Sequence, residues 1–119
     1  MDYVEYTQNR KPIVAVDFDG TLRIAGKPNK KLFDTIIDRK HDIDFILWTC
    51  REGKDLAEAI EFCKDNGWAP KYVNENVDKN LPDCRKVFAD YYIDDLSVYP
   101  DDTTFFDTLR NDIGLLIKQ

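Results

Sequence analysis

The sequence predicts an α/β fold, a three-layer α/β/α sandwich built around a central parallel sheet of four to five strands. Short apolar runs of strand length alternate along the chain with segments whose apolar residues recur at helical spacing. This alternation is typical of parallel sheets with helices packed on both faces. The length of 119 residues fits a single domain over residues 1–119, and 43% hydrophobic residues can supply one core.

The first half of the chain is predicted to form two strand–helix units. Residues 13–16 and 45–48 are continuous apolar runs that predict buried strands, and Thr49 follows the second run. A helical pattern follows each strand and ends near Lys40 in the first unit and at Gly67 in the second. The apolar positions that define these helices are Leu32, Phe33, Ile36 and Ile37, then Leu56, Ala59, Ile60 and Cys63.

The second half is predicted to add two strands and a closing helix. Tyr72 and Val73 form a weak third strand, and residues 91–93 form a fourth that ends at an acidic pair. Apolar residues between 105 and 116 predict the helix, which Gly114 weakens by about 1 kcal/mol. This segment fits a helix better than a strand, so the existence of a fifth strand stays open.

The composition disfavours several classes of protein. With 17 basic and 23 acidic residues, the net charge of −6 disfavours nonspecific nucleic-acid or membrane-surface binding, although a local basic site is compatible with it. No stretch reaches the ~18 apolar residues of a membrane helix, and polar residues 1–11 predict no signal peptide. Three cysteines without metal-site spacing predict reduced thiols in a cytoplasm. The single histidine, His41, is expected at an exposed helix end and argues against multi-histidine sites.

Polar residues follow three of the four predicted strands. Asp17 and Asp19 come after the first strand, Thr49 after the second, and Asp94 and Asp95 after the fourth. In parallel α/β sheets, ligands bind at the carboxyl ends of the strands. We therefore expect these side chains to meet at one edge of the sheet.

These side chains suit phosphoryl transfer. Clustered carboxylates repel one another unless a hard cation binds, and Mg²⁺ suits a few carboxylates together with water and phosphate oxygens. Asp17 could then attack phosphorus and form an aspartyl-phosphate, while Asp19 protonates the leaving oxygen and later deprotonates a water. Thr49, backbone N–H groups and a lysine would hold the phosphoryl oxygens. The competing interpretation of Asp17 and Asp19 is an Asx-turn pair in a loop.

Three segments resemble motifs of the haloacid dehalogenase-like (HAD) superfamily, whose domain is a Rossmann-type α/β/α sandwich. Residues 14–22 (VAVDFDGTL) closely resemble the first motif, residues 45–49 (FILWT) the second, and residues 91–95 (YYIDD) the fourth. The resemblance spans about residues 12–100. An aspartate at the position of Asp19 marks the phosphatase and phosphomutase branches and disfavours the dehalogenases and transport ATPases.

The resemblance implies a role for each acid. Asp17 is the implied nucleophile and Asp19 the implied acid and base. Mg²⁺ is implied to bind the Asp17 carboxylate, the backbone carbonyl of Asp19 and a fourth-motif acid. Asp95 is favoured as that acid, and Asp94 is then expected to support it or to fix water. Thr49 is implied to bind phosphate.

The resemblance also implies a lysine beside the phosphate. Lys86 fits best, because residues 85–90 lead directly into the fourth strand. Lys79 and Lys71 are the alternatives. Any of the three could instead be a solvated surface lysine, which is the usual environment of this residue type.

Substrate contacts are expected from the loops that follow the first two strands, at Gly20, Thr49, Cys50 and Arg51. Arg51 could clamp a phosphate or carboxylate with two hydrogen bonds. It could equally form a structural ion pair with Glu52, Asp55 or an acid of the first loop. Cys50 lacks a nearby histidine to activate its thiol, so we expect a small residue packed behind the strand end.

The chain leaves no room for the cap domain that many relatives insert over this site. The two usual insertion points correspond to residues 21–30 and 74–85, and both are too short to hold a domain. We therefore expect an open site that accepts a macromolecular or bulky phosphorylated substrate. A site completed by another subunit, as in a homodimer, also fits.

The leading functional hypothesis is a Mg²⁺-dependent phosphomonoester hydrolase (phosphatase). One alternative is a phosphate- or Mg²⁺-binding module without turnover, which would not need Asp19. Another is a nucleic-acid end-processing phosphatase, which the negative charge disfavours and a basic cluster at the site would favour. The residues of such a cluster would be Lys11, Arg23, Lys27, Lys30 and Lys31. A receiver-type signalling domain is disfavoured, because it carries its phosphorylated aspartate on a middle strand.

Overall fold

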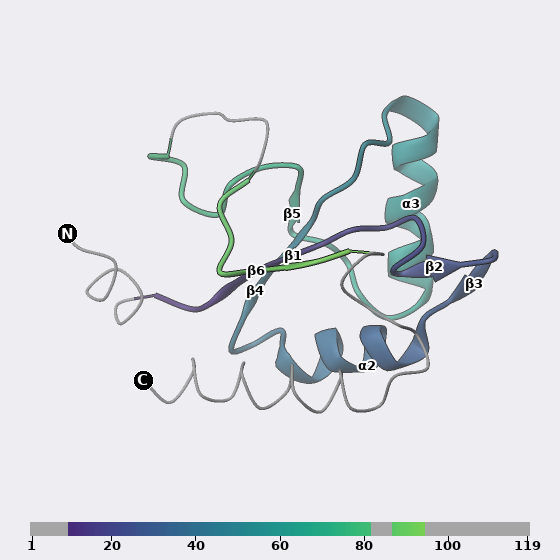
Figure 1. Ribbon diagram of the computed structural model, residues 1–119, viewed down its shortest axis with the longest axis horizontal. Helices are drawn as coiled ribbons and strands as arrows, with labels where there is room; N and C mark the ends of the chain where they lie inside the picture. The colour runs from purple at the N-terminus through teal and green to yellow at the C-terminus, as the bar shows by residue number, and fades with distance from the viewer. Residues whose placement is uncertain (1–9, 82–86, 95–119) are drawn as a thin grey trace.

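The computed structural model describes residues 10–81 and 87–94 of the chain, and its central feature is a four-stranded parallel sheet (Figure 1). The strands lie in the order β5-β4-β1-β6, and each neighbouring pair is parallel. Their bounds are β1 (Ile13–Val16), β4 (Asp44–Leu47), β5 (Tyr72–Val73) and β6 (Tyr91–Ile93). This arrangement confirms the predicted α/β fold with a central parallel sheet.

The strand predictions hold with one shift. β4 begins one residue early, at Asp44, and ends at Leu47, so Trp48 lies beyond the strand. Asp44 belongs to the strand because its N–H donates to the Pro12 carbonyl at 2.9 Å, a backbone bond that does not depend on an apolar side chain. The other three predicted strands have the expected positions.

Two helices follow the strands as predicted. The helix α2 (Lys30–Arg39) is capped by the preceding residue, Asn29, whose side chain accepts a hydrogen bond from the Leu32 N–H and satisfies one free donor of the first turn. The helix α3 (Gly53–Asp65) is followed by Gly67, whose φ of +96° is a conformation that glycine adopts at helix ends. His41 lies just after α2 and is exposed, as expected.

Both described helices pack on the same face of the sheet. One core cluster joins strand residues such as Val14, Val16 and Leu47 to Ile36 of α2 and Cys63 of α3. Burial raises the pKa of the Cys63 thiol to about 12, because the thiolate would lose its water.

The opposite face of the sheet is covered by chain that follows β5 and precedes β6. Its cluster contains Ile13, Ala15 and Ile46 of the sheet, with Val77 and Val87 packed against them. The helix predicted between residues 105 and 116 lies outside the described residues, so helices on both faces remain a prediction. In the part of the chain that is described, no helix has the length and apolar character needed to span a membrane.

A buried ion pair fixes the start of β1 to the segment that enters β6. Asp90 accepts hydrogen bonds from Arg10 Nη1 at 2.7 Å and Nη2 at 2.9 Å, and also from the Ile13 N–H at 2.8 Å. The Asp90 N–H donates in turn to the Ile13 carbonyl at 2.8 Å. The pair therefore sets where β6 begins against β1.

A small hairpin lies within residues 21–30, a stretch that we expected to be too short to hold a further domain. Strands β2 (Arg23–Ile24) and β3 (Lys27–Pro28) pair antiparallel around the dipeptide Ala25-Gly26. Both turn residues have positive φ, 50° at Ala25 and 79° at Gly26, which is typical of a tight two-residue hairpin turn. The hairpin projects at the right of the molecule, beside the lower end of α3 (Figure 1).

Candidate active site

The carboxyl ends of the three longest strands meet at one edge of the sheet. The last residue of β1, Val16, is in register with Leu47 of β4 and with Ile93 of β6. The Asp17 N–H donates to the Ile93 carbonyl and the Trp48 N–H to the Val16 carbonyl, both at 2.9 Å. Polar residues that follow these strands are therefore brought to the same edge, as the sequence predicted.

Asp17 and Asp94 are the acids nearest the strand ends. Each directly follows its strand, Asp17 after β1 and Asp94 after β6, and each is half-buried. Since β1 and β6 are neighbours, the two acids leave adjacent strands. Asp95 lies outside the described residues, so its expected place beside the metal is still a prediction.

The loop after β1 is a compact turn. The Phe18 carbonyl accepts hydrogen bonds from the N–H groups of Thr21, Leu22 and Arg23, at 3.0 to 3.2 Å. Gly20 has a φ of +77°, a conformation that glycine adopts readily and that permits this turn. The turn buries the Phe18 ring completely and leaves Asp19 on the surface.

Asp19 is held by Arg51 through two hydrogen bonds. Arg51 Nε donates to one carboxylate oxygen at 2.9 Å and Nη2 donates to the other at 2.8 Å. These hydrogen bonds lower the pKa of Asp19 below its ordinary value of 3.8, against a smaller opposing effect of burial. Arg51 thus favours the ionised form of Asp19, and Asp19 can take up and donate a proton only when the hold of Arg51 weakens.

The structure selects among the ion-pair partners expected for Arg51. Asp19, the acid of the first loop, is the partner, while Asp55 accepts a bond from Nη1 through its backbone carbonyl at 3.1 Å. Arg51 Nη1 also lies 3.9 Å from Glu58, which the sequence had not singled out. A role in clamping an anion remains compatible with this geometry, because a guanidinium can exchange one carboxylate for another anion.

The loop after β4 is tied to β5 by a residue that sequence reasoning missed. Asn74 follows β5 and accepts a hydrogen bond from the Thr49 N–H at 2.8 Å. Its φ of +53° suits asparagine, which tolerates this backbone region, and this preference is the signal that could have identified it. The Thr49 hydroxyl accepts from the Arg51 N–H at 3.2 Å, so Thr49 shapes the turn that carries Arg51.

The expectation for Cys50 is wrong. The thiol is exposed and is not packed behind the strand end. Trp48 already lies beyond β4, so the chain has left the sheet two residues before Cys50 and carries its side chain outward.

The candidate lysines occupy different places. Lys79 is exposed, and its Nζ lies 2.7 Å from Oε2 of Glu75, four residues earlier in the sequence. Lys71 precedes β5 and so lies at the amino ends of the strands, away from Asp17. Lys86 lies outside the described residues.

The donors at the edge are of the kind that Mg²⁺ prefers. They are the Asp17 and Asp94 carboxylates and the backbone carbonyl of Asp19, all hard oxygen ligands. Within residues 10–81 and 87–94, no three histidine, cysteine or acidic side chains come together as a metal-binding group. Mg²⁺ usually takes only one or two carboxylates and fills its remaining positions with water and phosphate oxygens, so this donor set fits the ion.

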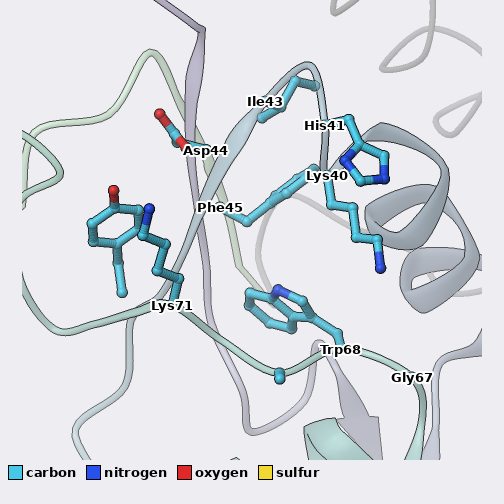
Figure 2. Close-up of a pocket in the computed structure, with 10 residues that line it drawn as sticks. Lys40, His41, Ile43, Asp44, Phe45, Gly67, Trp68 and Lys71 are labelled. Atoms are coloured by element: carbon cyan, nitrogen blue, oxygen red, sulfur yellow. The ribbon is translucent and has the colours of Figure 1, made fainter.

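A cavity of about 400 Å³ lies at the opposite end of the sheet (Figure 2). It opens between the end of α2, the start of β4 and the turn after α3, with Lys40, Asp44 and Trp68 among its lining residues. Asp44 is the first residue of β4, which places the cavity at the amino ends of the strands. Of the residues considered for the site, it is lined by Lys71, one of the alternative lysines, and by none of the acids or of Gly20, Thr49, Cys50 and Arg51.

Comparison with known proteins supports the fold. No family model and no curated protein matches the chain. The chain is similar to the solved structure of a conserved protein from Bacteroides thetaiotaomicron, with 29% sequence identity and a TM-score of 0.72. The match covers 87% of this chain and 93% of that protein, so the α/β architecture is shared over nearly the whole length of both.

Proposed function

We propose that this protein is a Mg²⁺-dependent phosphomonoester hydrolase of the HAD type that works through an aspartyl-phosphate on Asp17. The observation that carries the proposal is that acids directly follow two adjacent strands at the same edge of the sheet. Asp17 and Asp94 leave adjacent strands there, and Asp19 lies two residues beyond Asp17 on a turn held by Gly20. Parallel α/β sheets bind their ligands at this edge.

The acids divide the reaction into two steps. In the first, an Asp17 oxygen attacks phosphorus while the bond to the leaving oxygen breaks, and Asp19, which takes up a proton from solvent once Arg51 has released its carboxylate, gives that proton to the leaving oxygen. In the second, Asp19 takes a proton from water, whose oxygen attacks phosphorus and releases Asp17 and inorganic phosphate. Bound Mg²⁺, held by Asp17, Asp94 or Asp95 and the Asp19 carbonyl, would neutralise charge on the phosphoryl oxygens.

The remaining groups would bind the phosphate. Thr49 and the backbone N–H of Cys50 are proposed to hold phosphoryl oxygens, whereas the Gly20 N–H donates to the Arg23 carbonyl at 2.9 Å within the turn. Lys86 is proposed to neutralise the part of the phosphate charge that Mg²⁺ does not balance. Arg51 keeps Asp19 ionised, which suits its role as base in the second step.

The architecture that goes with this proposal is a single three-layer α/β/α domain without a cap. Between the loop of Asp19 and α2 the chain forms the small hairpin of β2 and β3. The site is then open to a bulky or macromolecular phosphorylated substrate. The free thiols of Cys50 and Cys63 suit a reducing cytoplasm.

Hydrolysis of an aryl phosphate, measured with and without Mg²⁺, tests the proposal. Asp17→Asn should lower kcat by about 1,000-fold or more, because it removes the nucleophile. Asp34→Asn is the matched control, since Asp34 is exposed on α2 and should leave turnover unchanged. Wild-type turnover equal to that of Asp17→Asn across a panel of phosphoesters would overturn the hydrolase.

A binding module without turnover is the second candidate. The two hydrogen bonds from Arg51 favour it, because they keep Asp19 ionised and so oppose proton donation. Calorimetric binding of Mg²⁺ and phosphate by a protein without phosphoester turnover would identify this module. For the end-processing phosphatase, Lys11 precedes β1 and so lies at the opposite edge from Asp17, whereas Arg23 lies beside Asp19, so the five basic residues do not form one cluster at the site.

A further inference from the structure

Two arginines and two carboxylates form a compact charge network beside the candidate active site. Arg23 Nη1 lies 2.7 Å from Glu58 Oε1, and its Nη2 lies 4.0 Å from Asp19 Oδ1. Arg51 Nη2 lies 2.8 Å from the same Asp19 oxygen, and its Nη1 lies 3.9 Å from the same Glu58 oxygen. Each guanidinium therefore reaches both carboxylates.

The arginines are the fixed members of this network. The Arg51 and Arg23 guanidinium carbons lie 4.8 Å and 5.1 Å from the centre of the buried Phe18 ring, and Arg23 also lies 5.6 Å from the Phe62 ring. Their side chains are 16% and 23% exposed. Asp19 and Glu58, by contrast, are 58% and 59% exposed. The cations are anchored on aromatic rings and the carboxylates cover them from the solvent side.

Glu58 has no part in the proposed reaction, which separates it from Asp19. It lies on the first half of α3, and its carboxylate bonds to Arg23 from a strongly hydrated position. Exposed ion pairs of this kind add little to stability, so the exchange of Glu58 for another anion costs little. The hydrogen bond from Arg23 lowers the pKa of Glu58, which keeps it ionised and keeps the arginines neutralised.

We propose that Arg23 and Arg51 form a clamp for a second anionic group of the substrate, and that Glu58 occupies the clamp until that group displaces it. This inference rests on the proposed function and specifies its substrate class. The substrate is a phosphomonoester whose leaving group carries a further phosphate or carboxylate. Because Arg51 also bonds Asp19, the clamp lies on the side of the site where Asp19 would protonate the leaving oxygen.

Binding of matched phosphonates tests the clamp without relying on turnover. Ethylphosphonate carries one anionic group, ethane-1,2-diphosphonate adds a second phosphonate, and 3-phosphonopropionate adds a carboxylate to the same two-carbon unit. Each ligand is titrated by calorimetry into wild-type protein and variants at one free Mg²⁺ concentration. The chelation of Mg²⁺ by a given ligand is then the same for every protein. The two doubly anionic ligands distinguish a phosphate from a carboxylate as the second group.

The clamp predicts a specific pattern of affinities. At least one doubly anionic ligand should bind wild type about tenfold more tightly than ethylphosphonate. Glu58→Gln should increase that preference by about threefold or more, because the competing carboxylate is removed. Arg23→Gln should abolish it, and Glu61→Gln, an exposed change one turn along α3, should leave it at the wild-type value.

Several results would overturn the clamp. They are equal binding of all three ligands by wild type, no binding of any of them at millimolar concentration, or the same preference in Glu58→Gln as in wild type. If Arg23→Gln fails to fold, the ligand preference of Glu58→Gln, a change at an exposed residue, still tests the clamp. Turnover of aryl phosphate without the predicted pattern of affinities would refute the clamp and support the hydrolase. The predicted pattern of affinities without turnover would refute the hydrolase and support the clamp as a binding site.

Discussion

At the scale of single residues, Arg51 does most to define the candidate site. Its guanidinium bonds Asp19 at two points and rests on the Phe18 ring, so one side chain links the first loop to the chain after β4. The folded-state pKa of Asp19 is lower than its ordinary value of 3.8. The interaction therefore stabilises the fold at pH values above 3.8, and this contribution is lost as the pH falls through the lowered folded-state pKa.

Replacing Arg51 should return the Asp19 pKa toward its ordinary value. In Arg51→Gln we expect the pKa of Asp19 to rise, because the hydrogen bonds that favour the carboxylate are gone. Carboxyl-carbon NMR titration of the metal-free protein measures this directly. Arg39→Gln, at the end of α2, is the control and should leave Asp19 unchanged. An unaltered Asp19 pKa in Arg51→Gln would contradict the conclusion that Arg51 lowers the pKa of Asp19.

At the scale of elements, the end of α3 is fitted to α2 through a glycine. Gly67 combines a φ of +96° with close contact to the neighbouring helix, since a Cβ added there would lie 2.8 Å from Ile37 Cδ1. The two effects differ in kind. The backbone strain depends on Gly67 alone, whereas the contact depends on the last carbon of a flexible side chain.

Gly67→Ala should lower the free energy of unfolding by about 1–2 kcal/mol, mainly because a non-glycine residue is strained at positive φ. Urea denaturation measures the change. Ile37→Val removes Cδ1, so the double variant should be less destabilised than the sum of the two single variants. Strict additivity would show that the contact with Ile37 contributes nothing, and an unchanged stability of Gly67→Ala would refute the strain.

At the scale of the whole molecule, the sequence predicts the sheet and the meeting of its strand ends because both follow from local patterns. Apolar runs locate β1, β4 and β6, and parallel pairing then brings their carboxyl ends together. The ion pair of Arg51 could be predicted only as a set of alternatives that included an acid of the first loop, and the contacts of Glu58 could not be predicted in this way. They join chain segments far apart in sequence through long side chains, and no periodicity records which carboxylate such a side chain reaches.

The hairpin was missed for a different reason. Its strands contain only two residues each, too few for an alternating pattern, and its one local signal is Ala25-Gly26 at the turn. In the proposed HAD-type architecture, this hairpin would stand at one of the points where many members of that superfamily insert a cap. Access to the proposed site would then depend on how little of the chain lies between Asp19 and α2.

An uncapped site should tolerate a large substrate. We expect kcat/KM for a phosphoserine within a peptide of about ten residues to stay within about tenfold of that for free phosphoserine, because no lid must close around the phosphate. Both substrates share the same leaving oxygen, so the comparison isolates size, and phosphate release measures both. Asp17→Asn gives the background for each substrate. A decrease of about 1,000-fold for the peptide would show an enclosed site and would contradict the open architecture, while leaving the chemistry at Asp17 intact.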